Sequence, residues 1–439
     1  MNNTSPQLSR LHHYLNYRIG ILPLPVYLTL LAIFVRFSLK GEINGEINMM
    51  IAALALGGFT CAAIGMHIPF LNRIGGAALV TIFLPSYLVN AHLLPGLFIQ
   101  QVTTFTSATN FIYLYIAAIV AGSILSMDRR GMVRSFLKIF VPLAAGSIVA
   151  MFVGTAVGSL GGLGVWKSLF FVVIPVMAGG VGEGAIPLSV GYAEILGQNQ
   201  GLVLAQLLPL VFFGNLTAIL LSGVLNNIGK RYPHLTGNGK LEPYPENEVP
   251  LASWRDASLT ALDVGTIAAA GMTAITIYLL GVLLHSLMGL PAPVGMLIIA
   301  VLLKLANVVP AEIEDGARIV FRFFVTAVTY PLLFATAVAL TPWRELVSAL
   351  HPANLITVIA TVASLTATGY FVGRGMKMYP VDTAIVNSTH SGLGGTGDVM
   401  ILTAAERMEL MPYAQVATRI GGAITVTLAL IALSRLRPF

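Results

Sequence analysis

The chain has 439 residues, of which 56% are hydrophobic and only 10% charged, and its formal net charge at pH 7 is +6. Soluble globular proteins carry roughly 25% charged residues, so the composition excludes a water-soluble body and predicts a protein that has lipid as its solvent. The positive charge does not indicate nucleic-acid binding, because the lysines and arginines are scattered between apolar runs, where they act as topology signals.

Apolar runs that approach the ~20 residues needed to cross a bilayer recur along the whole chain. They predict transmembrane helices near residues 21–38, 47–67, 75–92, 109–127, 135–160, 201–227, 261–287, 291–308, 317–341, 353–373 and 411–434. Basic residues precede the first run, as in a signal peptide, but no small-residue cleavage site follows before Arg36, so we interpret it as a retained helix. The single cysteine, Cys61, excludes a disulfide framework and a cysteine-based metal site.

Two further apolar stretches, 168–198 and 380–408, are interrupted by glycine clusters. They are typical of re-entrant hairpins rather than of simple spans. Most lysines and arginines fall in loops that share one side of this layout. Because cytoplasmic loops are enriched in these residues, the asymmetry predicts eleven spans with the N-terminus in the cytoplasm and the C-terminus outside.

One hydrophilic segment, 229–256, divides the chain near its middle and predicts a cytoplasmic linker. Residues 1–40 then form the cytoplasmic N-terminus and the first transmembrane helix. Residues 41–228 form a first repeat with the hairpin 168–198, and residues 257–439 form a second repeat with the hairpin 380–408.

The two repeats share a glycine motif. Gly179–Gly180–Val181–Gly182–Glu183 in the first hairpin and Gly394–Gly395–Thr396–Gly397–Asp398 in the second both read Gly-Gly-x-Gly followed by an acid. Five spans per repeat, an odd number, would invert the second repeat, so that the hairpins enter from opposite faces and their turns meet near mid-membrane. The predicted fold is an all-α membrane protein of about 11 transmembrane helices plus two re-entrant hairpins in two inverted five-helix repeats, an arrangement typical of alternating-access transporters.

These turns suit a small anion. Non-helical backbone at membrane depth persists only inside protein or beside a water-filled cavity, and glycine lets the backbone N–H groups approach a ligand. The helix that follows each turn directs its N-terminal amides at that cavity, which favours a carboxylate, and the turn carbonyls can coordinate a cation such as Na⁺. The alternative, glycines that only allow close helix packing, fits a single glycine run better than two matched ones. Candidate substrate-binding residues at the turns are Gly180, Val181, Gly182, Gly394, Gly395 and Thr396.

Arg419 is the third candidate feature. It lies about eight residues into the last predicted helix, hence ~12 Å deep, where a charge costs at least ~2.5–3.5 kcal/mol without a cavity or a partner. We expect it to bind a substrate carboxylate through the bidentate geometry of guanidinium. The alternatives are a structural ion pair, for example with Asp398, and an arginine that snorkels to the interface.

Candidates for binding the coupling cation, Na⁺ or H⁺, are Asp398, Glu183, Thr418, Ser391, His390 and Asn110. Capping of the second hairpin helix is the alternative role for Glu183 and Asp398. A hydrogen-bonded structural histidine is the alternative for His390. We expect no catalytic residue, no cofactor and no metal other than Na⁺ at the hairpin turns.

Three segments carry a resemblance to a known family. Gly179–Ser189, Ser391–Leu402 and Ala417–Ala423 resemble the 2-hydroxycarboxylate transporters, the group of bacterial citrate and malate symporters, over nearly the whole chain. The resemblance implies an inner-membrane homodimer, inverted five-helix repeats with two re-entrant hairpins, and uptake of citrate, malate or similar acids with Na⁺ or H⁺. It also implies that Arg419 contacts a substrate carboxylate and that the glycine turns line the site.

The chain departs from the sodium–citrate members of this family at two positions. Those members carry asparagine where this chain has Val181, and arginine where it has Leu393. Loss of the second cation weakens the case for a trianion, so malate or another dicarboxylate is favoured over citrate. We expect symport of this acid by an elevator-type movement of the hairpins.

Three other functions compete with symport of a carboxylate. Gly395–Asp398 matches the GxGD motif of intramembrane aspartyl proteases, but their chemistry needs a second aspartate, usually in a Tyr-Asp pair, and the sequence has no Tyr-Asp dipeptide. A channel or a carrier of unrelated substrates is the second alternative. The third is a precursor/product exchanger of carboxylates.

Overall fold

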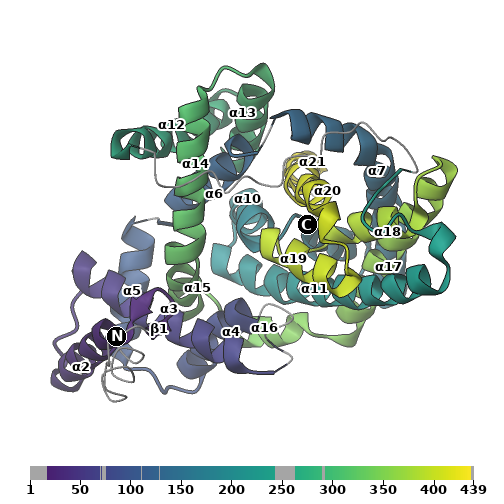
Figure 1. Cartoon of the computed structure of the whole chain (residues 1–439). Coiled ribbons are helices and arrows are strands. Elements are labelled where there is room, and N and C mark those ends of the chain that lie inside the picture. The colour runs from purple at the N-terminus through teal and green to yellow at the C-terminus, as the bar shows by residue number, and fades with distance from the viewer. Residues whose placement is uncertain are drawn as a thin grey trace, which may run out of the picture. The chain divides into compact units, whose positions relative to one another are not determined.

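The computed structural model describes residues 17–69, 71, 76–109, 111–127, 129–242, 263–288 and 292–436, and helix dominates these residues (Figure 1). The strands β1 (Arg18–Ile19) and β2 (Leu22–Pro23) form a short antiparallel pair. The helices of the first half are α2 (Leu24–Lys40), α3 (Ile47–His67), α4 (Gly76–Asn90), α5 (Gly96–Thr109), α6 (Phe111–Leu125), α7 (Arg129–Leu160), α8 (Val165–Lys167), η2 (Ser168–Val173), α9 (Ile174–Val176), η3 (Val181–Ala185), α10 (Ile186–Leu196), α11 (Gln200–Arg231) and η4 (Pro233–Leu235).

The second half is also helical. Its helices are α12 (Val264–Met288), α13 (Ala292–Ala306), α14 (Ala311–Phe323), η6 (Phe324–Val328), α15 (Thr329–Ala339), α16 (Trp343–Ala349), α17 (Pro352–Gly375), α18 (Pro380–Thr389), α19 (Gly395–Ala405), η7 (Met408–Leu410), α20 (Met411–Val416), η8 (Ala417–Gly421) and α21 (Gly422–Leu436). The predicted all-helical class is confirmed for the described residues.

The protein is a multi-span membrane protein. Among the described residues, seven helices are long and apolar enough to cross a bilayer, or eight if the bent pair α5 and α6 counts as one span. Several predicted spans are shorter helices, such as α4 and α13 with 15 residues each. The count of about eleven spans and the inverted repeats therefore remain predictions, as does the side on which each terminus lies.

Two helices were not predicted, and one predicted helix is divided. The helix α5 carries Gln100, Gln101 and several threonines, so it lacks the long apolar run that marks a span. The helix α16 has seven residues. The single helix expected at 317–341 is formed by α14, the π-helical turn η6 and α15.

The chain divides into two compact units, each with segments from both halves of the sequence. The first unit comprises the described residues of 1–113 and 323–343, and the second those of 114–322 and 344–439. In the first unit α3 packs against α4 and α15. Gly58 makes this approach close, because a Cβ there would lie 2.6 Å from the carbonyl carbon of Tyr330. Its core includes Met50, Phe98 and Phe334.

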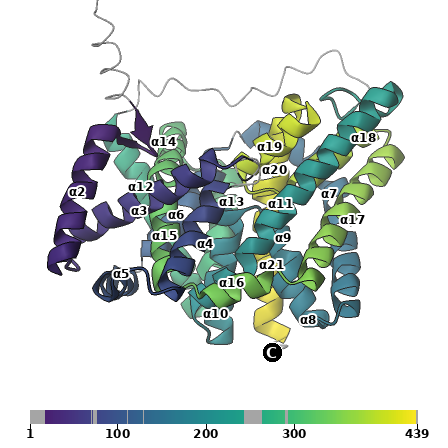
Figure 2. The same ribbon diagram turned by 90° about the horizontal axis from the view of Figure 1, so that it is seen from below.

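The second unit contains both hairpins, and its core is built on α7, α11, α17 and α18. Figure 2 shows α11 and α17 side by side. The helices α17 and α18 also approach closely, and small residues make this possible, as is usual in membrane proteins. A Cβ on Gly369 of α17 would lie 2.7 Å from the Cβ of Asn387 on α18. The amide of Asn387 donates to the carbonyls of Pro142, at 2.8 Å, and Leu365, at 3.3 Å, which fastens α18 to α7 and α17.

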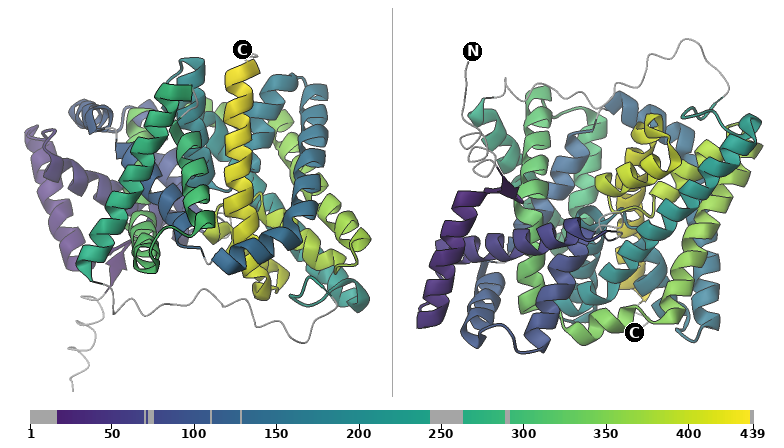
Figure 3. Two further views of the ribbon diagram at one scale, coloured as in Figure 1. Left: turned by 90° about the horizontal axis from the view of Figure 1, so that it is seen from above. Right: turned by 60° about the horizontal axis from the view of Figure 1, so that its bottom comes forward.

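The last helix belongs to the second unit and is continuous through α20, η8 and α21; Figure 3 shows the C-terminus at the end of this yellow helix. The predicted linker is described only up to residue 242, where a 3-10 turn, η4, follows α11. The rest of the linker, 243–256, lies outside the described residues.

Candidate functional site

Both predicted hairpins are helix pairs that break at their glycines. In the first hairpin the helix α9 ends at Val176 and η3 begins at Val181, so residues 177–180 form what we call the first turn. In the second hairpin α18 ends at Thr389 and α19 begins at Gly395, so residues 390–394 form the second turn. The φ angles of Gly179, Gly180 and Gly394 are +85°, +106° and +79°. Glycine reaches these values without the steric cost that a side chain would bring.

The two turns touch each other. A Cβ on Gly180 would lie 2.5 Å from the carbonyl carbon of Leu393 and 2.9 Å from the Cα of Gly394. Gly179 faces the last helix, where a Cβ would lie 3.2 Å from the Cα of Gly422. The predicted contact of the two glycine turns is confirmed. The segment η8–α21 packs against both turns and forms the third wall of the candidate site.

Arg419 lies on this third wall, in the π-helical turn η8. Its side chain is 6% exposed, and its Nε is 3.6 Å from Oε1 of Glu183, just after the first turn. Its Nη1 donates to the carbonyl of Ser123 on α6 at 3.3 Å. Its guanidinium carbon lies 5.0 Å from the ring centroid of Phe321, within the range of a cation–π contact. The sequence predicted the buried charge but not these partners.

Glu183 is therefore an ion-pair partner of Arg419. Its Oε1 also accepts a hydrogen bond from the Ser123 hydroxyl at 2.7 Å. Among the described residues Glu183 makes no hydrogen bond to a backbone N–H, so the capping role does not occur here. The alternative of an Arg419 ion pair with Asp398 does not occur within 4.0 Å either, in the part of the chain that the structure describes.

Asp398 and Thr418, predicted as cation ligands, lie together. Asp398 is fully buried, and its Oδ1 accepts the Thr418 hydroxyl at 2.6 Å. The same hydroxyl lies 3.1 Å from the carbonyl oxygen of Thr389 at the end of α18. Oδ2 of Asp398 has no hydrogen-bond partner among the described residues. We call Asp398 Oδ1, Thr418 Oγ1 and Thr389 O the oxygen cluster, and oxygen is the donor that hard cations prefer.

The remaining predicted cation ligands are bonded to backbone or lie outside the description. His390 is buried, and its Nδ1 donates to the carbonyl of Ala417 at 3.0 Å, which agrees with the structural role. The Ser391 hydroxyl donates to the Ser388 carbonyl at 2.8 Å. Asn110 and the side chain of Thr396 lie outside the described residues. The backbones of Val181, Gly182 and Gly395 start the helical segments after the turns, as predicted.

Comparison with known proteins identifies the family. The sequence profile described as the 2-hydroxycarboxylate transporter family matches residues 19–431. The chain belongs to this family. It is 51% identical, over 95% of this chain and 93% of the relative, to the citrate/malate-proton symporter of Bacillus subtilis (strain 168). Over the same shares it is 38% identical to the Na⁺-malate symporter of that strain. It is 28% identical to the citrate/sodium symporter of Salmonella typhimurium over 96% of this chain and 95% of that protein.

Family membership confirms the resemblance and decides between classes of function. This 2-hydroxycarboxylate transporter is not an enzyme, so the aspartyl protease alternative is excluded. The same membership shows a transport function for the chain.

Two buried amides of this transporter stand beside the second turn and were not predicted as site residues. Oδ1 of Asn215, on α11, accepts from the backbone N–H of Leu393 at 3.2 Å. The Nδ2 of Asn215 and the Oε1 of Gln415 have no hydrogen-bond partner in the described part of the chain. Gln415 lies beside Gly395, where a Cβ would be 3.3 Å from its Nε2. Both are amide residues with mainly apolar neighbours in the sequence, a signal that the hydropathy pattern carries.

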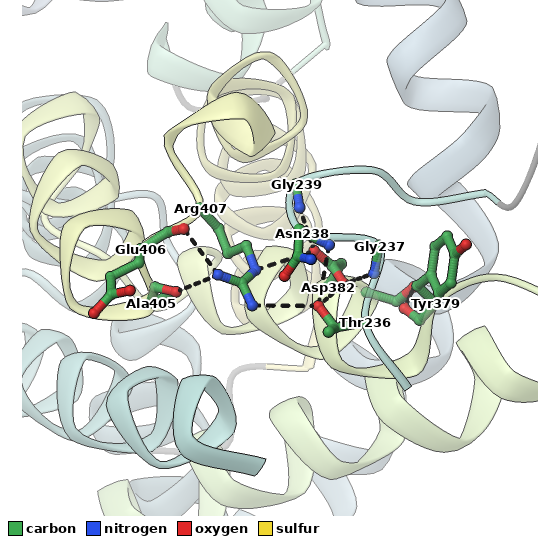
Figure 4. A network of polar contacts seen from close by, with 10 residues as sticks. Thr236, Gly237, Asn238, Gly239, Tyr379, Asp382, Ala405, Glu406 and Arg407 are labelled. Carbon is green, nitrogen blue, oxygen red and sulfur yellow. Dashed lines mark hydrogen bonds and ion pairs between the residues drawn. The ribbon is translucent and has the colours of Figure 1, made fainter. Parts of the chain in front are cut away.

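A second unpredicted feature fastens the transporter's second hairpin at its base (Figure 4). Asp382, at the start of α18 and fully buried, accepts hydrogen bonds from the Thr236 hydroxyl and the Gly237 N–H at 2.7 Å each, and from the Gly239 N–H at 2.8 Å. Nε of Arg407, just after α19, lies 3.6 Å from Oδ1 of Asp382. The segment after α11 thus joins both ends of the hairpin that carries the second turn.

Proposed function

We propose that this protein is a secondary active symporter that imports a 2-hydroxycarboxylate, with malate favoured over citrate, together with a cation. The observation that carries the proposal is the direct contact of the two glycine turns beside a buried arginine. Arg419 supplies a charged fork for one carboxylate. The backbone of Gly180–Gly182 and of Gly394–Thr396 supplies N–H groups for the rest of the acid.

The charge of the site favours a dianion. Leu393 and Val181 place apolar side chains at the two turns, where sodium–citrate members of the family have a cation and an amide. Arg419 is then the guanidinium that faces the turns, and Glu183 already offsets part of its charge. Among the described residues of the two turns there is no second guanidinium for a third carboxylate, and a dicarboxylate such as malate does not require one.

The oxygen cluster is the proposed cation site. Asp398 supplies a carboxyl oxygen, and Thr418 and the Thr389 carbonyl supply neutral oxygens. A cation held there lowers the electrostatic cost of admitting an anion into a low-dielectric site. From the sequence, Na⁺ was the expected coupling ion and H⁺ the alternative. The relative at 51% identity is named for protons and the relative at 38% for Na⁺, which favours H⁺ for this chain.

The proposed transport cycle is an elevator movement in a homodimer. In this proposal the hairpins enter from opposite faces of the bacterial inner membrane, within two inverted repeats, and the N-terminus is cytoplasmic. The second unit contains both turns, Arg419 and the oxygen cluster, which makes it the part that would carry the substrate. A cation bound with the acid offsets one negative charge of the loaded site, which lowers the cost of carrying the acid across lipid.

The test is uptake of labelled malate and citrate by proteoliposomes under imposed gradients of Na⁺ or of pH, each alone. The proposal expects accumulation of malate above equilibrium with one of the two gradients, and loss of that accumulation in Arg419→Ala. Uptake that needs neither gradient but requires a carboxylate inside the proteoliposomes for exchange would instead indicate a precursor/product exchanger.

A further inference from the structure

The contacts of Glu183 leave half of its carboxylate unused. Oε1 accepts the Ser123 hydroxyl at 2.7 Å and lies 3.6 Å from Nε of Arg419. Charge-assisted N–H···O bonds are about 2.7–2.9 Å long, so this ion pair is an attraction without a short bond at Nε. The other oxygen, Oε2, is buried and has no hydrogen-bond partner among the described residues. A bidentate substrate carboxylate would bind the guanidinium more completely than Glu183 does.

The other charges that act on Arg419 have closer partners of their own. These charges are Asp398 on α19 and Arg318 on α14. Asp398 is hydrogen-bonded to Thr418 at 2.6 Å, and Arg318 lies 3.2 Å from Asp315. In the part of the chain that the structure describes, Glu183 is the residue whose carboxylate oxygen lies within 4.0 Å of a guanidinium nitrogen of Arg419. Glu183 is thus the carboxylate that pairs with the arginine in this structure.

We propose that Glu183 is an internal competitor for the substrate. This inference rests on the proposed function, in which Arg419 binds a substrate carboxylate. The Glu183 carboxylate pairs with Arg419, and a substrate carboxylate competes with it for the guanidinium, while the Ser123 hydroxyl keeps its hydrogen bond to Oε1 of Glu183. Glu183 then sets two properties: it lowers the affinity for every substrate, and its charge repels a trianion more than a dianion. It is a specificity-determining residue that selects dicarboxylates.

The variant Glu183→Gln tests the proposal, because it removes the charge and keeps the shape and the acceptor for Ser123. Initial rates of labelled malate and citrate uptake are measured in proteoliposomes over a range of concentrations, at a pH where both acids are fully ionised. The expected KM for malate falls about three- to tenfold, and the KM for citrate falls by a larger factor, since removal of one negative charge matters more for a more negative ligand. The maximal rate changes less than the KM.

Two other variants supply controls. Glu194→Gln makes the same change on α10, at an exposed glutamate 3.3 Å from His285, and it leaves both KM values unchanged. Ser123→Ala removes the hydroxyl that holds Oε1 of Glu183, so Glu183 closes on Arg419 and the KM for malate rises. The opposite signs expected for Glu183→Gln and Ser123→Ala separate competition from general damage to the site.

The outcomes distinguish this inference from the proposed function. If the wild-type protein takes up neither acid, the proposed function fails. If the wild type transports malate and Glu183→Gln leaves its KM unchanged or raises it, Glu183 is not a competitor and instead orients Arg419, which overturns the inference. If Glu183→Gln does not elute as folded protein in size exclusion, Ser123→Ala decides, and an unchanged or lower KM overturns the inference.

Discussion

Replacement of Gly180 by alanine would force the two turns apart. The added Cβ would lie 2.5 Å from the carbonyl carbon of Leu393 and 2.9 Å from the Cα of Gly394, and these are backbone atoms that cannot rotate away. Overpacking of this kind costs about 1–3 kcal/mol, and a side chain at a φ of +106° costs about 1–3 kcal/mol more. Because 1.4 kcal/mol corresponds to about a tenfold change in an equilibrium, we expect malate uptake to fall at least about tenfold.

A matched variant isolates the contact between the turns. Gly197 also has a positive φ, +65°, but nothing lies within 4 Å of a Cβ placed there. Gly197→Ala therefore carries backbone strain of about 1–2 kcal/mol without a collision. Uptake of labelled malate by proteoliposomes and thermal unfolding are compared for both variants. If Gly180→Ala transports malate as well as Gly197→Ala does, the turns do not form the site.

Three further predictions concern the base of the second hairpin and the oxygen cluster. Asp382→Asn breaks a buried ion pair and should destabilise the protein by about 3–5 kcal/mol, measured as a lower unfolding temperature; an unchanged temperature would contradict the role given to this residue. Lys230 donates a hydrogen bond to Glu406 and holds the pKa of that exposed carboxyl below its usual value of 4.5. The contribution of this ion pair to the stability of the fold is therefore present at neutral pH and is lost as the pH falls through the lowered pKa of Glu406. Glu406→Gln should then lower the unfolding temperature slightly at pH 7 and not at all in acid. Asp398→Asn should reduce cation-driven accumulation of malate at least about tenfold, and equal accumulation would remove Asp398 from the cation site.

Much of the site follows from local sequence. The matched glycine motifs predicted two helix breaks, because a positive φ demands glycine. The expectation that the two breaks meet came from the odd number of spans in each predicted repeat. The depth of Arg419 in an apolar helix predicted a partner or a cavity, because an isolated charge there is costly. These inferences need only spacing and residue type, and the structure confirms the contact of the turns and the burial of Arg419.

What the sequence did not predict depends on contacts between distant segments. Ser123 and Glu183 are 60 positions apart, and Ser123 and Arg419 are 296 apart. A serine in an apolar helix gives no sign of such partners. For the same reason Arg407 was interpreted as a topology signal, although it lies 3.6 Å from Asp382 at the base of the second hairpin. Helix α5 was missed because its polar face lowers its hydropathy.

The role of Arg419 can be measured by calorimetric titration of the purified protein with malate, for the wild type and for Arg419→Lys. Lysine keeps the charge but lacks the planar fork that binds a carboxylate through two parallel bonds. If a substrate carboxylate binds at Arg419 between the glycine turns, Arg419→Lys weakens malate binding at least about tenfold without a change in the unfolding temperature. Equal affinity of the two proteins for malate would show that the acid binds elsewhere.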